Sequence, residues 1–155
     1  MSSKAKKSDS PITREQLIAN LNEDLAREYQ AIMPYIVYSQ VIKGAAYMSI
    51  AAELEKHAGE ELEHAITIAK QIDYLGGSPT VTPNKVKTSD KAVDMLRFDL
   101  KNETDTIAAY RERVKQCEAL GEFAMAEHIR EILMQEQEHQ IDLATALGED
   151  PPHNT

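Results

Sequence analysis

The sequence contains few of the residues that interrupt helices or cross-link chains. It has no tryptophan, 2 phenylalanines, 6 glycines and 6 prolines among 155 residues. So few turn-forming residues favour long helices over the many short strands of a sandwich or barrel. The single cysteine, Cys117, allows no disulfide bond within the chain. Disulfides are typical of oxidising compartments, so we expect a reducing, cytoplasmic setting.

Long apolar runs and excess positive charge are also missing. No run approaches the roughly 20 apolar residues of a membrane span, and the segment from Met1 to Asp9 lacks the apolar centre of a signal peptide. We therefore expect no membrane association. Aspartate and glutamate number 26 against 17 lysines and arginines, which gives a net charge of −9. This balance argues against a generally nucleic-acid-binding surface and is compatible with attraction of cations.

Three side chains that bind metals occur twice in the chain at one spacing. They are Glu28, Glu61 and His64, which recur 75 positions later as Glu103, Glu136 and His139. The residues around the first glutamate of each set repeat too, at offsets of three and four that fall on one face of a helix. The repeat predicts two helical hairpins that are copies of one another.

Residues that cap or interrupt helices divide the sequence into four predicted long helices. The first begins after the capping-box pattern Thr13-x-x-Gln16. The first helix is predicted to run to about Lys43, the second from about Ala46 to Leu75, the third from Ser89 or Asp90 to just before Gly121, and the fourth to about Leu147. We expect one all-α domain over residues 11–148, flanked by a flexible polar tail at 1–10 and a short tail at 149–155.

The length of the middle connection selects the topology. Links near Gly44 and Gly121 are short, whereas the segment from Gly76 to Thr88 has 13 residues. At about 3.3 Å per extended residue it spans roughly 43 Å, and a helix of about 29 residues is about 44 Å long. The segment can therefore cross the whole bundle, so that the second and third helices start at the same end.

The repeated side chains suit a pair of metal ions inside such a bundle. Glutamate and histidine three residues apart project from one helix face, so each Glu-x-x-His pair can hold one ion. Glu28 and Glu103 supply two further carboxylates. Four carboxylates balance two divalent cations, which permits burial that unpaired charges would oppose. Mixed carboxylate and imidazole ligands favour iron, with manganese as an alternative, over structural zinc.

Supporting roles follow from position on the same helix faces. Asp24 and Asp99 lie one turn before a ligand glutamate and are candidates to hold the outer ring nitrogen of a ligating histidine. Tyr35 and Tyr110 lie two turns after those glutamates, where each could bond a ligand carboxylate, relay an electron or pack in the core. His57 precedes Glu61 by four residues; a polar position near a helix end is favoured over an accessory ligand.

The six-residue pattern, with Leu-x3-Leu-x2-Glu before each first ligand, resembles the ferritin-like superfamily and most closely the bacterioferritins. The resemblance covers about residues 14–147. It implies a ferroxidase centre of two irons in which Glu61 and Glu136 are the bridging carboxylates. It also implies oxidation of Fe(II) by dioxygen or hydrogen peroxide, with storage of ferric mineral inside a homo-oligomeric shell.

Departures from related families refine that expectation. Bacterioferritins bind haem through a methionine directly after the second-helix glutamate, where this chain has Leu62, so we expect no haem. Only residues 149–155 remain for the short fifth helix of ferritins, which leaves shells of 12 or 24 subunits open, with 12 slightly favoured. Rubrerythrins carry a further glutamate where this chain has Thr106.

Two alternatives differ from iron storage. One is a peroxide-reducing diiron or dimanganese enzyme, similar to rubrerythrins or manganese catalases, with no mineral cavity. The other is a DNA-protecting mini-ferritin similar to Dps, which would use Lys4, Lys6 and Lys7 as a basic arm. A solubilising tail is the favoured interpretation of those lysines, because the arm is short and flanked by polar residues.

Overall fold

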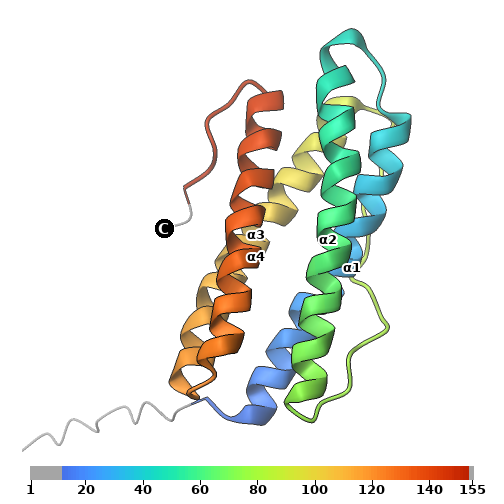
Figure 1. The fold of residues 1–155 in the computed structure, drawn as a ribbon. Helices are drawn as coiled ribbons and strands as arrows, with labels where there is room; N and C mark the ends of the chain where they lie inside the picture. The colour runs from blue at the N-terminus through green and yellow to red at the C-terminus, as the bar shows by residue number, and fades with distance from the viewer. Residues whose placement is uncertain (1–11, 154–155) are drawn as a thin grey trace, which may run out of the picture.

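The computed structural model describes residues 12–153 and has four long α-helices packed side by side (Figure 1). A short 3₁₀ turn, η1, lies before the second helix, and the described residues form no strand. The helices are α1 (Arg14–Val41), α2 (Met48–Tyr74), α3 (Ala92–Ala119) and α4 (Phe123–Ala146), and η1 is Ala45–Tyr47. The predicted all-α bundle is confirmed.

The helix boundaries agree with the predicted ones to within a few residues. Thr13 and Gln16 form the predicted capping box, and Gly76, with φ of 87°, adopts the left-handed conformation after α2. The third helix starts later than predicted, at Ala92. Ser89 instead accepts a hydrogen bond from the Lys91 amide and donates one to the Asp94 carboxylate, which holds this segment outside the helix.

The connection between α2 and α3, residues 75–91, runs the length of the bundle beside α1 (Figure 1). The Asn84 amide donates to the Ala26 carbonyl at 3.1 Å, and the Tyr29 hydroxyl donates to the Thr80 carbonyl at 3.0 Å. These bonds satisfy backbone groups of an otherwise irregular segment. The long crossover predicted from segment length is confirmed, and α2 and α3 start at the same end.

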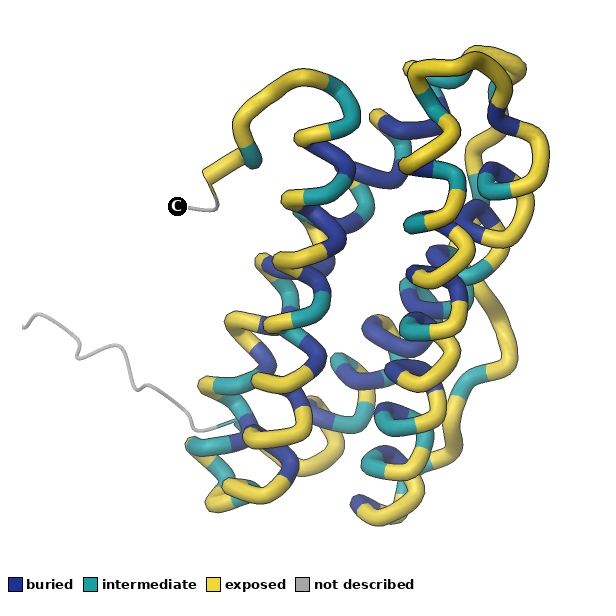
Figure 2. Tube along the Cα trace, turned by 45° about the horizontal axis from the view of Figure 1, so that its top comes forward, coloured by how far each residue is buried: buried dark blue, intermediate teal, exposed yellow. Residues whose placement is uncertain are grey.

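Two apolar clusters fill the bundle, one toward each end. Figure 2 shows the buried residues along the inward faces of the four helices. The first cluster, which we call the lower cluster, includes Leu17, Leu21, Leu25, Ile68, Ile72, Cys117 and Ile129. The second, the upper cluster, includes Tyr35, Tyr38, Leu54, Met95, Leu96, Leu100 and Leu143. The six repeated polar residues belong to neither cluster.

Some expectations concern segments outside the described part of the chain. The predicted N-terminal tail, with Lys4, Lys6 and Lys7, lies there, as do residues 154–155. Among residues 12–153, none of the helices combines the length and apolar character needed to cross a lipid bilayer.

Candidate metal centre

The bundle brings all six repeated residues together at its centre, and each is almost fully buried. They form two overlapping groups, within each of which one potential ligand atom per residue lies within 4.8 Å of the others. One group is Glu28, Glu61, His64 and Glu136; the other is Glu61, Glu103, Glu136 and His139. Glu61 and Glu136 belong to both groups, so each lies close to both sets of potential ligands.

The two histidines approach this centre in nearly the same way. Nδ1 of His64 lies 2.8 Å from Oε1 of Glu136, and Nδ1 of His139 lies 2.9 Å from Oε1 of Glu61. Each imidazole therefore meets the shared glutamate of the other hairpin. The 75-residue repeat in sequence corresponds to approximate two-fold symmetry in space.

Two tyrosines hold the outer glutamates. The Tyr35 hydroxyl on α1 donates to Oε1 of Glu103 on α3 at 2.5 Å. The Tyr110 hydroxyl on α3 donates to Oε1 of Glu28 on α1, also at 2.5 Å. Hydrogen bonds to a charged acceptor are short and strong, and here they restrict the carboxylate rotamers. Of the roles left open for the two tyrosines, the structure has the contact with a carboxylate.

The outward ring nitrogens face residues that sequence reasoning missed. Oε1 of Gln135 accepts from Nε2 of His64 at 2.5 Å, which leaves Nδ1 directed at the carboxylates. Oε1 of Glu60 lies 3.6 Å from Nε2 of His139, beyond hydrogen-bond distance. Glu60 and Gln135 are 75 positions apart, and each directly precedes one of the two shared glutamates, Glu61 and Glu136. The repeat itself was the signal that could have identified them.

The predicted role of Asp24 and Asp99 as histidine partners is wrong. Asp24 instead accepts hydrogen bonds from Arg27 at 2.6 Å and from Nε and Nη2 of Arg113 at 2.6 and 3.0 Å. The bidentate arginine from α3 satisfies the buried carboxylate more fully than one imidazole nitrogen could. Oδ2 of Asp99 has no hydrogen-bond partner among residues 12–153.

His57 is not the polar helix-end residue that was favoured. It lies within α2, is 1% exposed and stacks on His139 with ring centroids 3.9 Å apart. Its Nε2 lies 3.1 Å from Oδ2 of Asp142. Burial and the adjacent His139 lower the pKa of His57 to about 4, which keeps the ring neutral at physiological pH.

The pKa values at the centre reflect four carboxylates confined together. Burial and the neighbouring Glu136 and Glu28 raise the pKa of Glu61 well above its usual value. Burial and Glu136 raise that of Glu103 to about 7. Burial alone would lower the pKa of His139, but bonding to Glu103 and Glu136 raises it to about 11. Without metal, protons and imidazolium charge compensate the carboxylates.

The donor set fits two divalent cations. Several buried oxygen and nitrogen atoms of the six residues have no hydrogen-bond partner among the described residues: Oε2 of Glu28, Oε2 of Glu103, Oε2 of Glu136 and Nε2 of His139. Buried polar atoms are ordinarily paired. Two cations would provide partners for the three carboxylate oxygens among these atoms. They would also balance the four negative charges of the glutamates.

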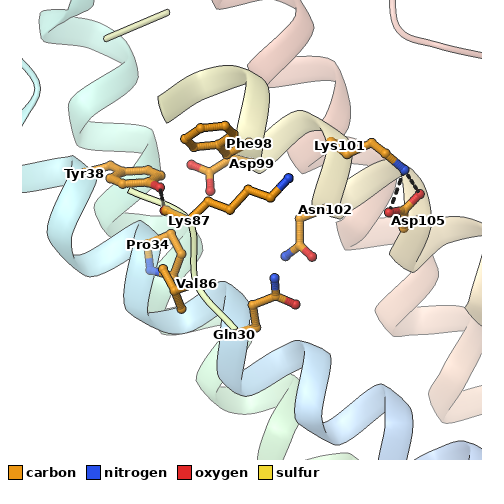
Figure 3. Close-up of a pocket in the computed structure, with 10 residues that line it drawn as sticks. All are labelled: Gln30, Pro34, Tyr38, Val86, Lys87, Phe98, Asp99, Lys101, Asn102 and Asp105. Carbon is orange, nitrogen blue, oxygen red and sulfur yellow. Dashed lines mark hydrogen bonds and ion pairs between the residues drawn. The ribbon is translucent and has the colours of Figure 1, made fainter. Parts of the chain in front are cut away.

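A small pocket reaches Asp99 from the crossover side. Figure 3 shows it between α1, α3 and the crossover, with Tyr38, Lys87 and Asp99 among its lining residues. Tyr38 donates to the backbone carbonyl of Lys87, which attaches the crossover to α1. Burial and Glu103 raise the pKa of Asp99 well above its usual value, so this face of the centre holds an unpaired acid.

Comparison with known families agrees with this geometry. The family model for the ferritin-like domain matches residues 18–151. The chain belongs to the ferritin-like family. Its relatives include a bacterioferritin from Brucella melitensis, 29% identical over 144 residues that cover 87% of this chain and 88% of the relative.

Solved structures of ferritin-like proteins have the same fold. A protein from Bacillus anthracis, described as a ferritin-like diiron-carboxylate protein, superposes with a TM-score of 0.83 at 30% identity and covers 86% of this chain and 96% of its own. A dodecameric thioferritin from Bacteroides fragilis, described as bacterioferritin-related, superposes with a TM-score of 0.81 at 28% identity, covering 88% and 87%. Membership in this family supports a role in iron storage and a dimetal site in the bundle.

Proposed function

We propose that this protein oxidises Fe(II) at a diiron centre formed by Glu28, Glu61, His64, Glu103, Glu136 and His139. The observation that carries the proposal is the pair of four-residue groups that share Glu61 and Glu136. Such sharing is what two metal ions bridged by carboxylates require. Manganese fits the same donors, and the iron-storage family favours iron.

Two iron ions in this centre would supply one electron each to dioxygen or to peroxide. With dioxygen, two electrons and two protons give hydrogen peroxide; with hydrogen peroxide, the same number gives two water molecules. The protein positions the ligands for this reaction. Tyr35 and Tyr110 fix the outer carboxylates, and Gln135 orients the imidazole of His64. The apolar clusters above and below exclude bulk water.

Storage of the oxidised iron requires a cavity between subunits, because the centre of one bundle accommodates only two ions. Exposed apolar side chains support such an assembly, because those on α1 are three, four and eight residues from the first and so share one face of the helix. They include Met33, Ile36, Val37 and Val41 on α1 and Leu62 and Ile66 on α2. We propose a closed homo-oligomer of 12 or 24 subunits; the relative described as dodecameric favours 12.

Titration of apo-protein with Fe(II) under air tests the centre. Rapid oxidation should saturate near two Fe(II) per chain and should be lost in Glu61→Ala/Glu136→Ala. The matched control is Glu63→Ala/Glu138→Ala, which removes exposed carboxylates two positions further along the same helices. Oxidation by the first double variant at the parent's rate would show that the site is wrongly assigned.

Loading with many tens of Fe(II) per chain tests storage. Sedimentation and electron microscopy should then show closed shells with electron-dense cores. A small oligomer that stays at two irons per chain and consumes hydrogen peroxide would instead support the peroxide-reducing alternative.

A further inference from the structure

A second cluster of metal-binding side chains lies beside the diiron centre. Glu53 and His57 are one turn apart on α2, and Asp142 faces them from α4. One potential ligand atom from each residue lies within 4.8 Å of the other two. One imidazole nitrogen and two carboxylates make a donor set for a divalent cation such as Fe(II), Co(II) or Zn(II).

The separation of these atoms matches that in the main centre. Nε2 of His57 lies 3.1 Å from Oδ2 of Asp142. In the main centre, Nδ1 of His64 lies 2.8 to 3.7 Å from the oxygens of three glutamates. Two ligand atoms that each sit about 2.1 Å from one ion are roughly 3.0 to 3.4 Å apart at ordinary coordination angles. The His57–Asp142 pair therefore needs little rearrangement to hold an ion.

Hydrogen bonding leaves the buried imidazole of His57 incompletely satisfied. The ring is 1% exposed, and its Nδ1 has no partner among residues 12–153. The other buried side-chain atoms in this condition belong to the diiron centre, apart from Oδ2 of Asp99. A polar ring buried with one unpaired nitrogen is costly, and His57 shares this feature with the residues assigned to iron.

The cluster is not a by-product of the duplication. The positions 75 residues away from Glu53, His57 and Asp142 are His128, Ile132 and Thr67. These three line a shallow surface pocket beside His64, but only His128 is a usual metal ligand. Acidic side chains such as Glu131 also line the pocket near His64. Among residues 12–153, however, three further potential ligands lie close together only at Glu53, His57 and Asp142.

The cluster also connects solvent with the centre. The Asp142 side chain is 39% exposed, whereas His57 is buried and stacks directly on His139. An ion held by Glu53, His57 and Asp142 would lie between the surface and one half of the diiron centre.

We propose that Glu53, His57 and Asp142 form a third divalent-cation site, which binds Fe(II) on its way to the diiron centre. The transfer role depends on the proposed ferroxidase function, whereas the binding site can be tested without it.

Anaerobic titration of the purified protein with Co(II), followed by visible absorption and equilibrium dialysis, provides that test. The parent should bind three Co(II) per chain. Asp142→Asn keeps the shape of a partly exposed side chain and should weaken the third site by about tenfold or more. His57→Ala should reduce binding to two, and His128→Ala, the repeat-related control, should leave three.

The outcomes separate the two proposals. Glu61→Ala/Glu136→Ala should lose the diiron pair and retain one Co(II) at the third site. A parent that binds two Co(II), or an Asp142→Asn variant with unchanged third-site affinity, overturns the third site and leaves the ferroxidase proposal standing. A parent that binds none overturns both. In substoichiometric Fe(II), Asp142→Asn should also oxidise iron more slowly than His128→Ala.

Discussion

The two halves of the centre have equivalent ligands, but they differ at the aspartate that lies one helical turn before the outer glutamate. This aspartate is Asp24 on one side and Asp99 on the other. Asp24, on the side of the lower cluster, is bonded by Arg27 and Arg113. Its repeat-related counterpart Asp99 has no such partner, because Asn102 and Tyr38 stand at the positions related to those arginines. The comparison teaches that the ligand geometry was retained while its surroundings diverged.

This divergence gives the two sides different chemistry. Around Asp24, buried ion pairs link α1 to α3 and close that side. Around Asp99 there is an acid with a raised pKa, caused by burial and Glu103, and the nearby His57 stacks on His139. Because an unpaired charge in a protein interior is destabilising, burial and Glu103 favour the protonated, uncharged form of Asp99. Beside His139, this half of the bundle also carries the third group of potential ligands, Glu53, His57 and Asp142.

The largest effect should come from breaking the ion pairs around Asp24. Arg113→Met should lower the free energy of unfolding of the apo-protein by about 3–5 kcal/mol, because it removes a bidentate partner from a buried carboxylate. Urea unfolding at fixed protein concentration measures the change. Arg130→Ala, which removes an exposed pair with Glu118, should change stability by about 1 kcal/mol or less. Equal losses in the two variants would refute the contrast.

The stability of the metal-free protein should depend on pH, because the four buried carboxylates then have no cations to balance their charge. The raised pKa of Glu61 and of Glu103, the latter to about 7, means that their protonated forms favour the folded state. Stability should therefore fall as pH rises from 4.5 through 7. The pKa of His139 is raised from 6.5 to about 11, so its protonated form also favours the folded state. Stability should therefore continue to fall as pH rises above 6.5.

Acidification acts in the opposite direction on two other ligands. Despite burial, hydrogen bonds within the centre lower the pKa values of Glu28 and Glu136, so the stability they contribute is lost as pH falls below 4.5. Thermal unfolding across this range should show a maximum just above pH 4.5 in the apo-protein. Two equivalents of Zn(II) should remove the decline on the alkaline side, since the cations replace protons as compensating charge. A metal-independent profile would contradict the assignment.

Removing either tyrosine hydroxyl should have an intermediate effect on metal affinity, and the effect should be the same for Tyr35 and Tyr110. Tyr35→Phe and Tyr110→Phe each remove one hydrogen bond to an outer glutamate. Each should weaken binding of one Co(II) by about 1.5–3 kcal/mol, the range for hydrogen bonds to charged groups. Calorimetric titration of both variants measures this. A large effect from only one tyrosine would show that the asymmetry extends into the ligand shell.

The smallest effect should come from neutralising Asp99. Asp99→Asn should stabilise the apo-protein at pH 8 by about 1 kcal/mol, because the raised pKa shows that the charged form of the buried carboxyl is unfavourable. The benefit should become small near pH 3.8, the ordinary pKa of an aspartate, because the carboxyl then becomes protonated in the unfolded chain as well. Asp24→Asn, in contrast, should destabilise at pH 8. Urea unfolding at both pH values distinguishes these outcomes.

The sequence by itself determined most of the architecture. Helix-capping and helix-ending residues, such as Thr13 and Gly76, located the helices. The length of the segment between the second and third helices determined the crossover. The duplicated Glu-x-x-His pattern selected six residues that the structure places together, because residues three and four apart must share a helix face. Local periodicity and chain length carry this information without knowledge of the partner helix.

Only the tertiary structure decided which side chains meet across the bundle. Helical periodicity places Asp24 and Gln135 on inward faces, but it does not state that one meets Arg113 and the other His64. Nor does it show that His57 is buried against His139. Those contacts depend on the rotation and axial offset of neighbouring helices, which result from packing of the whole core and are not encoded in any single segment.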